Sequence, residues 1–290
     1  TGFLGRALQK KLDDHLVILT SRSDEMENSS RFFRKTISSA ENFSDCLNDV
    51  DVVIHASGMN SQDCEDDPNM ALEVNGIATS NLLMAAIKQK VGRFIYLSTI
   101  HVYGAPLTGR ITEESPVKGI HPYATSHQVG ENAVLTESRK GNIEGIVVRL
   151  SNAFGPPVYN DVNCWMLLVN DLCKQAVNQQ KLVLNSSGKQ KRDFVSLSNA
   201  CSAIIYLTEC DLSDEDSYLF NIGGNWAPSI IEISKNDLEN ATKILQENSV
   251  HFDELGSINE DNLIIDNKTK VSIDDLIKSH TNWLTNYMEN

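Results

Sequence analysis

The sequence has no uninterrupted apolar run of the ~18 to 20 residues that a membrane-spanning helix needs, and no recognisable secretory signal. Positive charge is scarce: 25 lysines and arginines stand against 39 aspartates and glutamates, a net charge of −14. Nucleic acids and anionic membrane surfaces attract basic patches. We therefore predict a soluble, cytoplasmic protein that binds neither nucleic acid nor membranes.

The six cysteines form no CxxC pair and no spacing typical of metal ligands. They are Cys46, Cys64, Cys164, Cys173, Cys201 and Cys210. Scattered cysteines of this kind are typical of reduced, mostly buried thiols rather than of a disulfide framework. The sequence predicts neither a disulfide scaffold nor a metal site.

Strand-like apolar runs alternate with helix-like segments over about the first 150 residues. The runs are 16–20, 51–58, 93–97 and 144–150, and the helix-like segments include 6–14 and 75–88. Short runs that are apolar throughout are typical of a parallel sheet covered by helices on both faces. The pattern predicts an α/β fold with a doubly wound, Rossmann-like parallel sheet.

Two regions are expected along the chain. Residues 1–150 form the dinucleotide-binding region, and its first strand is expected to precede Thr1 because the sequence begins inside a glycine-rich turn. The turn-rich stretch after Ser151 opens a smaller C-terminal substrate lobe that takes up most of 151–290. A helix over 164–177 and a closing helix over 273–287 are expected in that lobe.

Small residues mark two places where a dinucleotide backbone fits closely. Gly2 and Gly5, with Phe3 and Leu4 between them, allow a tight turn that presents helix N-terminal N–H groups to a pyrophosphate. Ala56, Ser57 and Gly58 end the second apolar run in the same way. The alternative for the first place is an ordinary turn.

The residues after the 16–20 run bear on the choice of cofactor. An acidic residue at the end of that strand favours NAD, whereas a cation accommodates the 2′-phosphate of NADP. Ser21 and Arg22 stand there, so NADP(H) is the preferred cofactor and NAD(H) the other possibility. The alternatives are that Arg22 is a solvated surface charge, or that Asp24 serves NAD.

The polar residues with the most informative spacing are a phenol and an imidazole. Tyr123 and His127 lie four residues apart, so on a helix they share one face. Ser98 and Thr99 end the apolar run at 93–97, and Thr99 precedes Tyr123 by 24 residues. A tyrosine needs a nearby cation to work as an acid/base group near neutral pH, because its ordinary pKa is about 10.

Together these motifs resemble the extended short-chain dehydrogenase/reductase family, the nucleotide-sugar epimerases and dehydratases. The resemblance implies that Tyr123 is the acid/base, that Thr99 donates a hydrogen bond to the reacting sugar oxygen, and that Ser98 and Asn75 lie beside the cofactor. The alternatives are a packed aromatic at Tyr123, a hydroxyl of Thr99 that binds strand-end backbone, and a helix-capping Asn75.

The chain departs from the family pattern at two positions. His127 stands where the family has a lysine; it is a working substitute, a mark of cofactor binding with weak chemistry, or an incidental histidine. Ile100 and His101 stand where the dehydratases carry an Asp-Glu pair, which disfavours loss of water.

The resemblance also implies the substrate contacts. Asn152 and Arg192 match residues that hold the nucleotide diphosphate, and the alternative for Arg192 is a surface network with Asp193. The segments near 192–206 and 218–224 return to the main domain, and the family pattern fades after Gly224. A homodimer is expected, since relatives pair through the tyrosine helix and its neighbour.

We therefore expect an NAD(P)-dependent sugar-nucleotide epimerase or keto-sugar reductase that transfers hydride at a sugar carbon, C4 by resemblance. The alternative is a cofactor-binding protein with weak or no catalysis, because His127 replaces the family lysine.

Overall fold

The computed structural model describes residues 2–21, 32–34, 40–159, 162–179, 191–212, 218–224, 257–259, 262–265 and 269–272. The chain divides into two compact units. The first comprises 1–158, 162–167 and 191–227, and the second 159–161, 168–190 and 228–290. The boundary at residue 150 and the assignment of 151–290 to a substrate lobe stay predictions.

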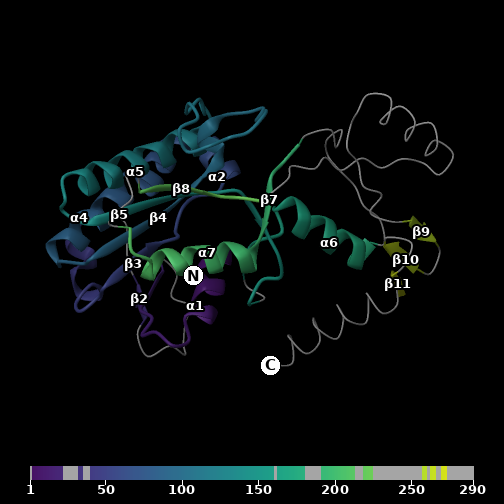
Figure 1. The fold of residues 1–290 in the computed structure, drawn as a ribbon, viewed down its shortest axis with the longest axis horizontal. Helices are drawn as coiled ribbons and strands as arrows, with labels where there is room; N and C mark the ends of the chain where they lie inside the picture. The colour runs from purple at the N-terminus through teal and green to yellow at the C-terminus, as the bar shows by residue number, and fades with distance from the viewer. Residues whose placement is uncertain are drawn as a thin grey trace. The chain divides into compact units, whose positions relative to one another are not determined.

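The first unit is built on a parallel sheet (Figure 1). Its strands are β3 (Val52–His55), β4 (Arg93–Thr99), β5 (Glu144–Leu150) and β8 (Leu219–Ile222), in the order β3-β4-β5-β8. Each neighbouring pair runs parallel. Two short parallel pairs accompany the sheet, β1 (Leu19–Ser21) with β2 (Phe32–Arg34) and β6 (Asn152–Phe154) with β7 (Phe194–Ser196).

Alternating side chains of β4 divide the core into two layers. Phe94 and Tyr96 pack with α4 (Ala78–Lys88) and α5 (Pro122–Arg139) in one cluster, whereas Ile95 and Leu97 pack with α1 (Phe3–Lys11) and α7 (Leu197–Glu209) in the other. Successive residues of a strand point to opposite faces, so a strand that is apolar throughout is buried on both. Figure 1 shows α4 and α5 on one side of the sheet and α1 and α7 on the other. The predicted doubly wound α/β fold is confirmed.

Several element boundaries differ from the expected ones. The first helix begins at Phe3, directly after its N-cap Gly2. The helix predicted from Cys164 is α6 (Leu168–Gln179), in the second unit. The second unit also holds an antiparallel sheet of β9 (Ser257–Asn259), β10 (Asn262–Ile265) and β11 (Thr269–Ser272). The closing helix expected over 273–287 falls outside the described residues.

The helix expected to begin at Asn75 begins earlier. It runs without a break through α3 (Pro68–Ala71), the π-helical turn η2 (Leu72–Ile77) and α4. The Asp67 carboxylate accepts a hydrogen bond from the Met70 N–H at 3.0 Å, and Pro68 fits the first turn, where its missing N–H costs nothing. These two residues set the helix start.

The same helix, Pro68–Lys88, is long and apolar enough by composition to cross a membrane, yet half of its most apolar window is buried inside the protein. A core helix meets the same criterion, so this feature is weak evidence for a membrane segment.

A buried ion pair ties α5 to the sheet. The Arg149 guanidinium on β5 donates to both carboxylate oxygens of Glu131 on α5, at 3.0 and 2.7 Å. Ser98 donates to the same carboxylate, and a further guanidinium N–H bonds the Tyr103 hydroxyl at 2.9 Å. Two charges this deep are stable together only when their remaining hydrogen-bonding groups are satisfied. The network thus fixes where α5 lies along the strands.

Candidate active site

The carboxyl ends of the strands form an accessible edge. Ala56, Ser57 and Gly58 follow β3 and are exposed. A Cβ added to Gly2 or Gly5 would meet no atom within 4 Å, so open space lies over the backbone at the start of the nine-residue helix α1. Exposed backbone N–H groups at a helix N-terminus suit a phosphate, and this edge fits the pyrophosphate of a dinucleotide.

The two hydroxyls at the end of β4 are both buried and both engaged. Ser98 donates to Glu131 at 2.5 Å, which commits its proton to the ion-pair network. Thr99 accepts from the His101 N–H at 3.2 Å and so caps the short turn η3 (Ile100–Tyr103). The Thr99 hydroxyl therefore binds the backbone at the strand end, which is the alternative considered from the sequence. Because the hydroxyl oxygen accepts in this bond, its proton stays available for another partner.

Tyr123 and His127 lie on one face of α5, as the spacing predicts. His121 caps this helix by accepting from the Tyr123 N–H at 3.1 Å, and Pro122 occupies the first turn. The rings of Tyr123 and His127 meet edge to face with centroids 4.7 Å apart. The His101 ring meets Tyr123 in the same way at 5.8 Å. The phenol thus lies between two imidazoles.

Burial raises the pKa of Tyr123, and a side-chain hydrogen bond with Thr99 offsets part of that rise. The effect of burial follows from the cost of placing a phenolate in a poorly solvated site. Tyr123 is therefore protonated at neutral pH in the free chain. Thr99 therefore lies close enough to Tyr123 to influence its pKa.

His127 is buried, and burial together with the neighbouring His55 and His101 lowers its pKa to about 3. Burial likewise lowers the pKa of His55 to about 4, and burial and the positive charge of Arg192 lower that of His101. All three imidazoles are neutral near pH 7. The positive charge of the family lysine is therefore not replaced at position 127.

Asn75 lies inside the π-helical turn, so the helix-capping alternative is wrong. Its side-chain carbonyl accepts from the Met59 N–H at 2.8 Å, and its amide donates to Ser126 at 2.9 Å. A Cβ on Gly58 would lie 3.0 Å from that carbonyl. Asn75 thus braces the turn after β3 against α5, and its proximity to a cofactor stays a prediction.

Asn152 and Arg192 come together through the pairing of β6 with β7. Asn152 donates to the Asp193 carbonyl at 2.8 Å, so its amide is committed to backbone. Arg192 is exposed, and its charge is close enough to lower the pKa of His101. A guanidinium therefore lies near the group formed by Thr99, His101 and Tyr123.

Ser21 ends β1, as expected, but its side chain, together with Arg22 and Asp24, lies outside the described residues. The argument for NADP(H) from these positions stays a prediction.

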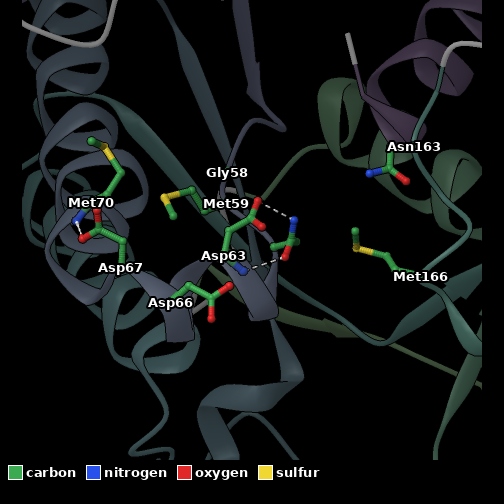
Figure 2. A pocket seen from close by; sticks show the side chains of 9 residues that line it. Gly58, Met59, Asp63, Asp66, Asp67, Met70, Asn163 and Met166 are labelled. Carbon is green, nitrogen blue, oxygen red and sulfur yellow. Dashed lines mark hydrogen bonds between the residues drawn. The ribbon is translucent and has the colours of Figure 1, made fainter. Parts of the chain in front are cut away.

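A pocket of about 690 Å³ opens beside Gly58 (Figure 2). Its lining consists of Gly58, Met59, Asn60, Asp63, Asp66, Asp67, Met70, Asn163 and Met166. Asp63 is hydrogen-bonded to Asn60 and Asp67 to the Met70 backbone. Three carboxylates with no cation in the lining repel a phosphate, so this pocket is not where a diphosphate would lie.

The residues that contact His127 and hold its helix in place could not be identified from the sequence. Tyr96 lies within hydrogen-bonding distance of His127, and Glu131 with Arg149 holds the helix that carries it. In the sequence, Tyr96 cannot be distinguished from the apolar residues of the buried strand around it. Only its place two residues after Phe94, on the face toward α5, could have signalled the contact.

The fold and this edge define a class: an α/β protein with a dinucleotide-binding sheet and a tyrosine at its carboxyl edge. Residues 1–223 match the NAD dependent epimerase/dehydratase family, and the chain belongs to that family. The resemblance seen in the sequence is confirmed.

Known relatives are distant. The chain is 27% identical over 168 residues with dTDP-glucose 4,6-dehydratase from Streptomyces niveus, which is 58% of this chain and 48% of that enzyme. A solved structure of MoeE5 in complex with UDP-glucuronic acid and NAD aligns with a TM-score of 0.67 at 24% identity, covering 85% of this chain and 80% of that one. The chain thus spans about half the length of this curated relative.

A second similarity is of another kind. Over 79 residues the chain is 77% identical with phosphoribosylformylglycinamidine synthase subunit PurL from Pelagibacter ubique, which is 27% of this chain and 10% of that protein. The name of PurL is not that of an epimerase or a dehydratase. The family match ends at residue 223, and 67 residues of the chain follow it.

The buried histidines predict a pH-dependent stability. Unfolded histidine takes up a proton near pH 6.5, while folded His55 and His127 resist it down to about pH 4 and 3. The unfolded chain therefore binds more protons in this window, and the free energy of unfolding falls as the pH falls, by up to about 1.4 kcal/mol per pH unit for each histidine.

Urea unfolding at pH 7.0, 6.0 and 5.5 measures this slope. His127→Gln should make it shallower. Equal slopes for the wild type and His127→Gln would contradict the expectation.

Proposed function

We propose that the chain is an NAD(P)-dependent oxidoreductase acting on a nucleotide sugar, a keto-sugar reductase or an epimerase that transfers hydride at a sugar carbon, C4 by resemblance to the family. The observation that carries the proposal is the proximity of Thr99 to Tyr123 at the carboxyl edge of the sheet, with Arg192 nearby. Dehydration is not proposed, since Ile100 and His101 replace the carboxylates that it needs.

The cofactor would lie along the carboxyl edge. Gly2 to Gly5 would hold its pyrophosphate, and Ala56 to Gly58 would pass beside its backbone, because both places are open. Arg22, which follows the 16–20 run in the sequence, supports NADP(H) over NAD(H). When bound, the nicotinamide supplies or accepts the hydride.

Tyr123 would carry the proton. Its phenol is protonated in the free chain, which suits donation to a carbonyl oxygen as that carbon is reduced. Thr99 would orient the same oxygen through its hydroxyl. Because Tyr123 is protonated before substrate binds, it is ready to donate a proton rather than to accept one. This supports a reductase over an epimerase.

Arg192 would bind the diphosphate, since a guanidinium pairs with phosphate oxygens through two N–H groups. Asn152 would act through the Asp193 backbone rather than by direct contact, because its amide is already engaged. We place the substrate contacts in 151–223, within the family match.

A second candidate is a cofactor-binding protein without turnover. The neutral His127 favours it, since no cation at that position stabilises the Tyr123 phenolate.

One titration separates these functions. The purified chain is mixed with NADPH or NADH, with and without UDP-, GDP-, dTDP- and CDP-sugars, and nicotinamide fluorescence and product sugars are followed. We expect tighter binding of NADPH and net oxidation with one keto-sugar, and loss of turnover by at least about a hundredfold in Tyr123→Phe with binding retained.

Turnover without net oxidation would identify an epimerase. Binding of cofactor with no sugar converted would establish the second candidate, and binding of neither cofactor would exclude both. Tyr206→Phe removes an exposed phenol on α7, away from the Tyr123 group, and is the matched control.

The residues beyond the family match form a separate proposal. We infer that the PurL-like stretch includes 224–290, because the family pattern fades after Gly224 and a segment 77% identical with another enzyme fits poorly inside a match to this family. This segment would then contribute nothing to the sugar-nucleotide site.

A chain ending at Ala227, the last residue of the first unit, tests this inference. It should bind NADPH within about threefold of the full chain, since all proposed cofactor residues remain. A loss of binding in a chain that keeps its circular dichroism spectrum would show that the tail belongs to the site.

We also propose a homodimer through the helices over 68–88 and α5. Exposed apolar side chains concentrate on these helices: Met70, Leu72, Ile77, Met84 and Val129. Such a patch is typical of a contact between subunits. Sedimentation should give a dimer that Ile77→Glu converts to a monomer, whereas Leu16→Glu, at an exposed side chain outside the patch, should not. A monomeric wild-type chain would exclude the proposal.

A further inference from the structure

Tyr96 contacts the residue at which the chain departs from its family. Its ring is completely enclosed in β4. Its hydroxyl lies 2.8 Å from His127 Nδ1 and 3.2 Å from the Asn75 carbonyl oxygen. The Tyr96 and His127 rings stack with centroids 5.8 Å apart and planes 30° apart. Position and orientation of the imidazole are therefore both set by this tyrosine.

The hydrogen bonds around Tyr96 and His127 indicate which atoms carry the phenolic and imidazole protons. A tyrosine hydroxyl has one proton to donate, and a neutral imidazole has one N–H and one acceptor nitrogen. The Asn75 carbonyl already accepts from the Thr79 hydroxyl at 2.7 Å, and Nδ1 is the nearer acceptor for Tyr96. The phenolic proton is therefore assigned to the bond with Nδ1, and the imidazole proton to Nε2.

The second ring nitrogen is left available. Within the part of the chain that the structure describes, no group hydrogen-bonds His127 Nε2, and this atom is not among the fully enclosed polar atoms without a partner. A Cβ on Gly58, at the open edge after β3, would lie 3.7 Å from the ring carbon between the two nitrogens. His127 thus borders the edge at which the cofactor is proposed to bind.

We propose that Tyr96 is a positioning residue for His127: by donating to Nδ1 it holds the imidazole in the Nε2–H tautomer and presents that N–H to the nicotinamide ribose hydroxyls. The tautomer rests on the two distances of the Tyr96 hydroxyl and on the prior bond of the Asn75 carbonyl to Thr79, whereas the ribose contact rests on the proposed function.

The replacement of the family lysine by His127 explains why a positioning residue such as Tyr96 is needed. A lysine ammonium has three donors on a flexible stem and needs no fixed orientation to donate. A neutral imidazole donates from one nitrogen only, and its other hydrogen bond decides which. Tyr96 therefore supplies what the shorter side chain lacks.

Gly130 makes room for the contact. It lies on α5 three residues after His127, on the same face, and a Cβ there would meet the Tyr96 hydroxyl and ring at 2.7 Å and the Asn75 carbonyl at 2.9 Å. Any side chain at this position would displace Tyr96 from His127. The absence of a side chain at Gly130 is thus part of the same arrangement.

Nitrogen-15 NMR of the full chain without cofactor tests the tautomer directly. We expect His127 in wild type to show a protonated Nε2 and an unprotonated Nδ1 near pH 7. In Tyr96→Phe, which removes only the hydroxyl, the Nδ1–H form should become populated. The matched control Tyr206→Phe removes the hydroxyl of an exposed tyrosine on α7 and should leave His127 unchanged.

NADPH titration tests the consequence. Tyr96→Phe should weaken binding about two- to tenfold, the range of one hydrogen bond. In a His127→Ala background the same substitution should cost nothing more, because its effect passes through the imidazole. A purely structural role would give the same loss in both backgrounds.

The outcomes separate this inference from the proposed function. An Nδ1–H tautomer in wild type, or an unchanged tautomer in Tyr96→Phe, would overturn the positioning role even if sugars are turned over. If neither NADPH nor NADH binds to wild type, the proposed function fails and the ribose contact with it, while the NMR result still decides the tautomer.

Discussion

The position of α5 depends on one buried ion pair. Glu131 and Arg149 satisfy each other through two hydrogen bonds between helix and strand, and Ser98 adds a third partner. Separating them would leave an uncompensated charge in the core, which is among the costlier defects a fold can carry. Because Glu131 sits one turn after His127, the pair fixes the height at which the Tyr123 and His127 rings meet the end of β4.

Above that pair the candidate site is weakly charged. Burial keeps His55 and His127 neutral and the Tyr123 phenol protonated, and the charge of Arg192 reaches His101 in the same group. A family site with lysine carries its positive charge on the same helix as the tyrosine. Here the position of that charge holds a neutral imidazole with a hydrogen bond and ring contacts, and the Tyr123 phenol is protonated.

The chain has two similarities, one to a family over a stated range and one to an unrelated name over a shorter length. The family match over 1–223 covers the sheet, both helical layers and every proposed site residue. The PurL similarity covers 79 residues, and the inference that it includes the end of the chain agrees with the loss of the family pattern after Gly224. All the proposed site residues lie in the first unit.

The sequence by itself determined the class of fold and the central pair of site residues. The runs 93–97 and 144–150 contain consecutive apolar residues, Phe94 to Leu97 and Ile146 to Val148, which is typical of a sheet buried on both faces. Tyr123 and His127 share a helix face because their spacing is local, and local geometry is fixed by the backbone alone.

Only the tertiary structure decided what surrounds them. Asn75 looked like a helix start, yet Asp67 and Pro68 begin the helix earlier and place Asn75 against Ser126, 51 residues away. Tyr96 could not be distinguished from its apolar neighbours on β4, because its partner His127 lies 31 residues along the chain. The protonation states of Tyr123 and the buried histidines could not be predicted from the sequence either. Burial sets them, and burial is a property of the packed chain.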